Sequence, residues 1–97
     1  MRCKITVLRT MLYEDLAKEY APKFGLCPVF KEGEVYYTGG MFGIYKPEGF
    51  CEPAWDAIHK LATVLASGGK VYNRNVNIAC CNDGIRPVIF KLEPVED

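Results

Sequence analysis

Five cysteines are the side chains of this 97-residue sequence with the widest chemical scope. Thiolates select zinc, copper(I) and iron–sulfur clusters over hard cations. No apolar run approaches the roughly 20 residues that span a bilayer, and the first residues alternate like a strand, so a cytoplasmic location is expected. Thiols stay reduced in that compartment, and an odd number cannot all pair within one chain. Metal ligation, thiol reactivity and simple burial therefore remain as interpretations.

Three of the cysteines lie where regular structure is expected to break. Cys27 stands in a loop before Pro28, Cys51 directly precedes a helix, and Cys81 stands at a hairpin turn. Loops carry functional groups more often than strand interiors, and a helix N-terminus favours a nearby thiolate by about 0.3–1 kcal/mol. The sequence predicts a cofactor site with Cys27, Cys51 and Cys81 as metal ligands and Cys80 as a candidate fourth.

The spacing of these residues leaves two other interpretations open. No Cys-x-x-Cys element of the kind found in zinc ribbons and bacterial ferredoxins is present, so the three thiols can meet only through the fold. Free cysteine is among the most buried residue types, and the thiols could equally be apolar packing in a metal-free binding module. Alternatively, Cys51 or Cys81 is the nucleophile of a thiol-based redox enzyme or sensor.

Residues 76–93 predict a β-hairpin, with two apolar runs on either side of Asn-Asp-Gly. Glycine tolerates positive φ, so Gly84 is expected to close a three-residue turn. Side chains of a strand alternate between faces. This alternation predicts Cys80 inside the sheet beside Ile78, and it leaves Cys81 available.

Weaker candidates have structural explanations. Arg86 is expected to pair with Asp83 across the hairpin turn, with an anionic ligand beside the thiol as the alternative. His59 is the single histidine and fits the margin of a helix stripe better than a catalytic or metal-binding role. The glycine-rich residues 39–43 lack the lysine and strand-to-helix context of a phosphate loop.

The expected fold is α+β, a single domain over residues 1–97 with a mostly antiparallel sheet of about four strands and two helices packed on it. Composition is ordinary for a globular protein, and twelve acidic residues balance twelve basic ones, which argues against nucleic-acid binding. Periodicity predicts strands at 2–9, 33–38, 71–80 and 86–94 and helices at 11–21 and 53–67.

Two helices on one sheet would leave part of it uncovered. Cys3, Ile5 and Val7 alternate onto the inner face of the first strand, with Cys3 as a small core residue. Leu8 and Ile89 fall on outer faces. They predict self-association into a homo-oligomer through apolar strand residues.

Five motifs together resemble one family: KITVL (4–8), YEDLAKEY (13–20), CPVFKEG (27–33), PEGFCEPAW (47–55) and CCNDGIRPVIFKL (80–92). They are similar to those of a small uncharacterised protein family of anaerobic bacteria and archaea, over nearly the whole chain. Its pattern, Gly-Phe-Cys…Ala-Trp followed by Cys-x-Asp-Gly-x-Arg-Pro-Val-x-Phe, has cysteines matching Cys27, Cys51 and Cys81. The chain departs from it at Glu52-Pro53 and at residues 39–43.

The resemblance implies no reaction or substrate, but an anaerobic setting favours an oxygen-sensitive cofactor. The sequence thus predicts a small cytoplasmic iron–sulfur protein with a redox or cofactor-holding role. Zinc or no metal is the alternative to the iron–sulfur cluster. Expected partners are a second copy of the chain and a redox protein, with no nucleic acid and no membrane.

Overall fold

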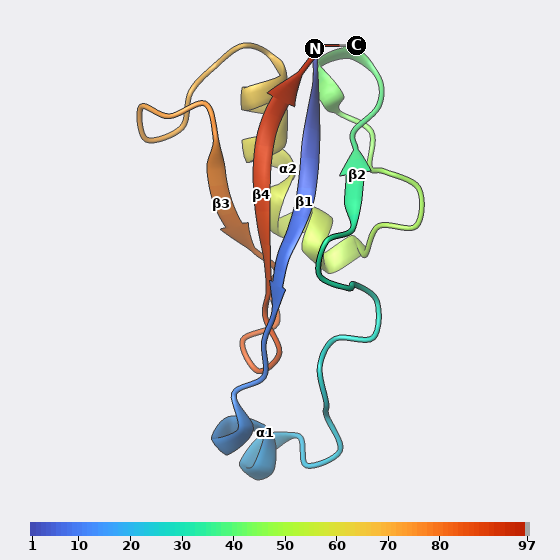
Figure 1. The fold of residues 1–97 in the computed structure, drawn as a ribbon, viewed down its shortest axis with the longest axis vertical. Coiled ribbons are helices and arrows are strands. Elements are labelled where there is room, and N and C mark those ends of the chain that lie inside the picture. The colour runs from blue at the N-terminus through green and yellow to red at the C-terminus, as the bar shows by residue number, and fades with distance from the viewer. Residues whose placement is uncertain (97) are drawn as a thin grey trace.

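The fold is a four-stranded antiparallel sheet with one long helix across its inner face (Figure 1). The computed structural model describes residues 1–96. The strand order is β2-β1-β4-β3, and the α+β class predicted from the sequence is confirmed. The elements in chain order are β1 (Arg2–Thr10), α1 (Glu14–Tyr20), β2 (Val35–Tyr37), the 3-10 turn η1 (Met41–Gly43), α2 (Glu52–Ala66), β3 (Asn77–Cys80) and β4 (Val88–Val95).

The core lies between the two central strands and α2. Alternation along β1 and β4 brings their apolar residues to one face, and α2 covers that face with a stripe at helical spacing. The predicted inner faces of both central strands are confirmed, and α2 begins and ends within one residue of its predicted bounds. The residues of this core with at most 1% exposure include Cys3, Ile5, Val7, Ala54, Ile58, Ala62, Leu65, Val88, Phe90 and Leu92.

The strand β3 is shorter than the predicted 71–80. Tyr72 and Asn73 have positive φ values of 52° and 61°, and a bridge joins Val71 to Arg74, so this stretch is a tight turn. Tyr72 is 84% exposed at the turn. The strand therefore begins only at Asn77.

The predicted faces of β3 were wrong. Asn77 pairs with Leu92 and Ala79 with Phe90, and residues directly opposite each other in a sheet share a face. Asn77 is therefore buried, whereas Ile78 is 57% exposed and Cys80 is also exposed. A shift of one residue exchanges the two faces of a strand, and β4 sets which of them is buried here.

The sequence predicts that both helices pack on the sheet, but the first helix, α1, packs on none of the strands. Figure 1 shows α1 beyond the end of the sheet opposite the two chain termini. Backbone hydrogen bonds from Met11 N to Pro87 O (3.0 Å) and from Tyr13 N to Ile85 O (2.8 Å) fix its base to the loop between β3 and β4. Within residues 1–96, no helix is both long enough and apolar enough to cross a membrane.

Candidate functional site

A cavity of about 160 Å³ lies where the start of α2, the loop after β3 and the segment around residue 27 meet. It brings together the three cysteines predicted as ligands, Cys27, Cys51 and Cys81. The other residues that line the cavity are Val29, Phe30, Pro53, Ala54, Asn82, Asp83, Arg86 and Val88. Three cysteines that are far apart in the sequence therefore line one cavity.

Cys51 is the residue that caps the N-terminus of α2. Its backbone is extended (φ −64°, ψ 131°), and its carbonyl accepts the first helical hydrogen bond from Trp55 N at 2.9 Å. The thiol makes no capping hydrogen bond, and Pro53 stands in the first turn. The sulfur therefore lies near the positive end of the helix dipole without being used to close the helix.

Cys81 continues the inward alternation of β3 one residue beyond the strand. Its N–H donates to Val88 O at 3.1 Å, and Val88 N–H donates to Cys81 Sγ at 3.3 Å. The backbone of β4 thus fixes both the main chain and the sulfur of Cys81.

Phe30, three residues after Cys27, anchors the loop that carries Cys27. Phe30 is 2% exposed and packs on Phe50 and Phe90, with ring centroids 4.9 Å and 5.2 Å apart. The backbone bond from Gly33 N to Val7 O (2.8 Å) joins the same loop to β1. Burial of Phe30 in the core therefore keeps the half-buried Cys27 packed against the core's edge.

Asp83 organises the turn that carries Cys81. Its Oδ1 accepts hydrogen bonds from Ile85 N (3.0 Å) and Arg86 N (3.3 Å), and its Oδ2 lies 3.0 Å from Arg86 Nε. Burial by itself would raise the pKa of this carboxyl, but the hydrogen bonds and the guanidinium outweigh it and hold the pKa below its usual value. The predicted Asp83–Arg86 pair is confirmed. The positive φ predicted for Gly84 is wrong, because the Asp83 side chain forms the turn instead.

Arg86 is held on two sides at the cavity rim. Its Cζ lies 3.9 Å from the ring centroid of Phe24, and its charge faces the Asp83 carboxylate. A paired guanidinium attracts an anion less than a free one does. The arrangement favours the structural role of Arg86 over the anion-binding alternative.

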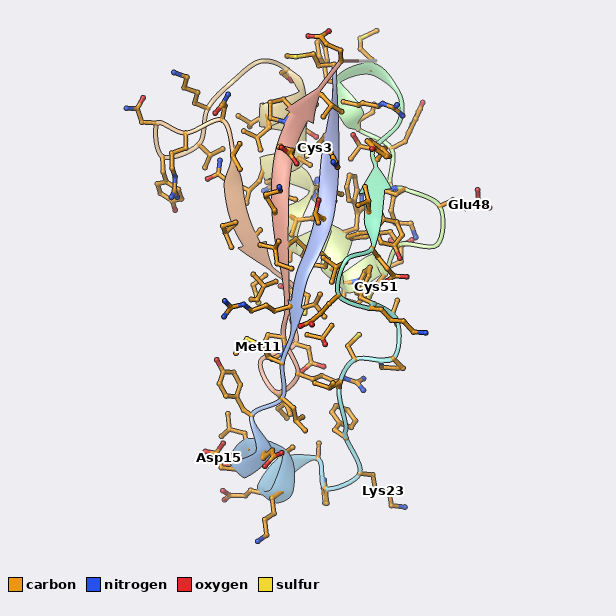
Figure 2. All side chains as sticks on the ribbon, in the orientation of Figure 1. Cys3, Met11, Asp15, Lys23, Glu48 and Cys51 are labelled. Atoms are coloured by element: carbon orange, nitrogen blue, oxygen red, sulfur yellow. The ribbon has the colours of Figure 1, made fainter. Side chains whose placement is uncertain are left out.

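The two remaining cysteines lie outside the cavity. Cys3 is fully buried in β1, toward the end of the sheet that carries the termini, whereas Cys51 lies toward the other end (Figure 2). Burial raises the pKa of Cys3 to about 11. The pKa of Cys80 is also raised. The main cause is partial burial of its thiol, and the second is its interaction with the adjacent Cys81. Cys80 is exposed and does not line the cavity, so its placement gives no support to its role as a fourth ligand.

The thiols surround the cavity without closing on a single point. Within residues 1–96, no three His, Cys, Asp or Glu side chains are arranged so that they could hold one metal ion. His59 lies on α2 with its ring 5.8 Å from that of Trp55, at the margin of the helix stripe as expected. The arrangement is that of three thiols on separate walls of one hollow.

Sequence reasoning missed the contact that closes the cavity between the hairpin and α2. Asn82 Nδ2 donates to Pro53 O at 3.1 Å and joins the turn directly to the first turn of the helix. The sequence marked Asn82 only as a turn residue. No local pattern relates these two positions, because the contact depends on how the hairpin and the helix pack.

Comparisons with known proteins identify no relative of this chain. A scan of family models, a search of curated proteins and a search of solved structures each found no match. The family resemblance noted in the motifs therefore stays a prediction.

Proposed function

We propose that this protein binds an iron–sulfur cluster in the cavity through Cys27, Cys51 and Cys81, and that it has a redox or cofactor-holding role. The observation that carries the proposal is the convergence of these three thiols, from three separate segments, on one hollow. Thiolates are the usual protein ligands of such clusters. The two cysteines with regular strand positions, Cys3 and Cys80, are left out of the site.

A cluster fits this arrangement better than a single ion. The cavity volume of about 160 Å³ is far larger than the roughly 10–15 Å³ that a cavity needs in order to hold one water molecule. A cluster of several iron and sulfide atoms holds its thiolate ligands farther apart than one ion does. It can therefore take one thiolate from each of three walls.

The chain's own residues suit a negatively charged group at this position. The dipole of α2 and the Val88 N–H offer partial positive charge to Cys51 and Cys81, respectively. Hydrogen bonds to sulfur and limited solvent access are two of the protein features that set cluster potentials. Phe30, Ala54 and Val88 form apolar walls that limit water. When bound, the cluster would supply one-electron transfer or a coordination position that the three cysteines leave open.

Anaerobic reconstitution with iron and sulfide tests the proposal. We expect a coloured protein with iron and acid-labile sulfide bound to each chain, and an electron paramagnetic resonance signal in one redox state. Cys27→Ser, Cys51→Ser and Cys81→Ser should each lower the iron content severalfold. A colourless protein without metal after reconstitution would overturn the proposal, and binding of zinc alone would replace the cluster with a mononuclear thiolate site.

The remaining cysteines supply matched controls for the same measurement. Cys80→Ser changes the residue next to Cys81 on an exposed position, and Cys3→Ala removes a thiol from the core. Both variants should retain the iron and sulfide content of the unmodified chain. Loss of iron in Cys80→Ser equal to that in Cys81→Ser would show that the cavity does not define the ligand set.

A second candidate function is thiol chemistry at Cys81, favoured by the hydrogen bond from Val88 N–H to its sulfur. Alkylation of the metal-free protein at neutral pH, followed residue by residue with mass spectrometry, tests it. A reactive Cys81 should be modified faster than Cys80, although Cys80 is the more exposed of the two. Equal or slower modification of Cys81 would exclude this function.

A further inference from the structure

Residues 11–29 form an arm that projects from the end of the sheet (Figure 1). The arm comprises α1 and the irregular segment that follows it. Six of the large apolar side chains along it have exposed fractions between 39% and 69%. These are Tyr13, Leu16, Tyr20, Phe24, Leu26 and Val29, of which Phe24 also stacks against Arg86 and Val29 also lines the cavity.

The helix in this arm buries only one of its side chains within the chain, that of Ala17, which is 5% exposed. It has seven residues and no side-chain capping hydrogen bond at Tyr13, and in the described part of the chain it packs on no other helix or strand. Isolated helices of this length are marginal in water, and most helical stability in proteins comes from tertiary packing. The apolar surface of α1 is therefore expected to be covered by something outside this chain.

The charges beside that surface are negative. At 100° per residue, Leu16 and Tyr20 share one stripe of α1, and Asp15 and Glu19 border it on one side. Lys18 lies on the opposite side of the helix. A partner for the stripe should therefore combine apolar side chains with positive charge.

The outer face of the sheet has this combination. Because α2 covers the inner face, the outward face of β1, β3 and β4 is left without a covering element, and it carries the exposed Leu8 and Ile78 and the half-buried Ile89. The outward charges of β1 and β4 are four cations and one anion, the latter paired with Lys91 at 3.3 Å. They are Arg2, Lys4, Arg9, Lys91 and Glu93, and the Arg2 guanidinium stacks on Tyr37 with its Cζ 4.7 Å from the ring centroid.

The arm cannot reach the outer face of its own sheet while its base remains in place. The backbone bonds of Met11 and Tyr13 to the loop between β3 and β4 direct it beyond the sheet end (Figure 1). We propose that the arm docks on the outer sheet face of a second copy of this chain, in a reciprocal two-fold dimer. Such an isologous contact covers both open surfaces of both chains and pairs negative with positive charge.

Charge reversal on each surface tests this arrangement. One variant carries Asp15→Lys and Glu19→Lys in the arm, and the other carries Lys4→Glu and Lys91→Glu on the sheet face. In sedimentation velocity over a range of concentrations, the unmodified chain should dimerise, and each variant alone should dimerise at least ten times more weakly. An equimolar mixture of the two variants should restore the dimer, because each reversed arm then meets a reversed face.

Two further variants separate this contact from general loss of structure. Tyr20→Ser removes the most exposed aromatic ring of the arm and should weaken the dimer with an unchanged circular dichroism spectrum. Tyr72→Asp changes a ring that is even more exposed, 84% against 69%, on a distant turn and should leave the dimer intact. A monomer at every concentration, a dimer that persists in both reversed variants, or a mixture that stays monomeric would each overturn the proposal.

Discussion

The side chain of Asp83 stabilises the turn between β3 and β4. One carboxylate accepts two backbone N–H groups and pairs with Arg86, so the loop that carries Cys81 and lines the cavity depends on a charge. The side chain is 36% exposed, which screens the ion pair. The hydrogen bonds to backbone are therefore expected to dominate its contribution to stability.

Replacement of this carboxylate should make stability less sensitive to acid. Asp83→Asn should lower the free energy of unfolding by about 1 kcal/mol at pH 7, since the charge pair is lost and one acceptor oxygen becomes a donor. The folded pKa of Asp83 lies below its unfolded value of about 3.9, so its stabilisation is complete above that pH and fades as the pH falls toward the folded pKa. Urea unfolding at several pH values should show the two proteins converging in acid. Asp56→Asn, an exposed change on α2, should leave stability nearly constant throughout.

Cys3 should make the fold sensitive to alkali instead. Its pKa is raised from 9.0 to about 11 in the folded chain, so the unfolded thiol ionises first as the pH rises. The stabilisation is present below the unfolded pKa and is lost between the two values, by up to about 1.4 kcal/mol per pH unit. In unfolding measurements between pH 8 and pH 11, Cys3→Ala should show a shallower decline than the unmodified chain. An unchanged decline would mean that other groups cause it.

At the scale of elements, the 3-10 turn η1 packs against both β1 and α2, and its backbone at Gly43 lies close to the neighbouring side chains. Gly43 has φ +63°, and a Cβ there would collide with Thr38 Oγ1 and press against Ala66. Thr38 Oγ1 in turn accepts a hydrogen bond from Cys3 N at 2.9 Å. Glycine at this position therefore permits a buried contact between three elements.

A pair of glycine substitutions separates this contact from backbone strain. Gly43→Ala should destabilise the fold by more than about 2 kcal/mol, because steric overlap adds to the cost of roughly 1–2 kcal/mol for a left-handed residue. Gly49→Ala has the same conformational cost at φ +78° but an open space around its Cβ. Thermal melts of both variants should give the larger loss for Gly43→Ala, and equal losses would contradict the packing argument.

At the scale of the whole molecule, the arm that we expect to form the dimer contact also contributes to the thiol cavity. The base of the arm is bonded to Ile85 and Pro87, and its last residues include Cys27. The segment that we expect to dock on a second chain is therefore continuous with two walls of the thiol cavity. Dimerisation should restrict the motion of those walls.

Dimerisation should also appear in the melting temperature. If two chains fold and associate together, the melting temperature of the metal-free protein should rise with protein concentration by mass action. The variant with Asp15→Lys and Glu19→Lys should melt at a temperature that does not depend on concentration. Calorimetry over a hundredfold concentration range would measure this, and a concentration-independent melt of the unmodified chain would contradict it.

The sequence by itself determined the features that rest on local periodicity. Alternation identified the inner faces of β1 and β4, helical spacing located α2, and chain irregularities selected Cys27, Cys51 and Cys81, which meet around one cavity. Each of these depends on the residue types at neighbouring positions and on the geometry of a single strand, helix or turn.

The tertiary structure decided what depends on pairing between distant segments. The register of β3 on β4 placed Cys80 outward and Cys81 inward, the reverse of what its own alternation favoured. Packing joined Asn82 to Pro53, and backbone bonds to the hairpin loop directed α1 away from the sheet. In a short strand with apolar residues on both faces, the sequence does not determine which face is buried. The pairing register with the neighbouring strand decides it, because a shift of one residue exchanges the two faces.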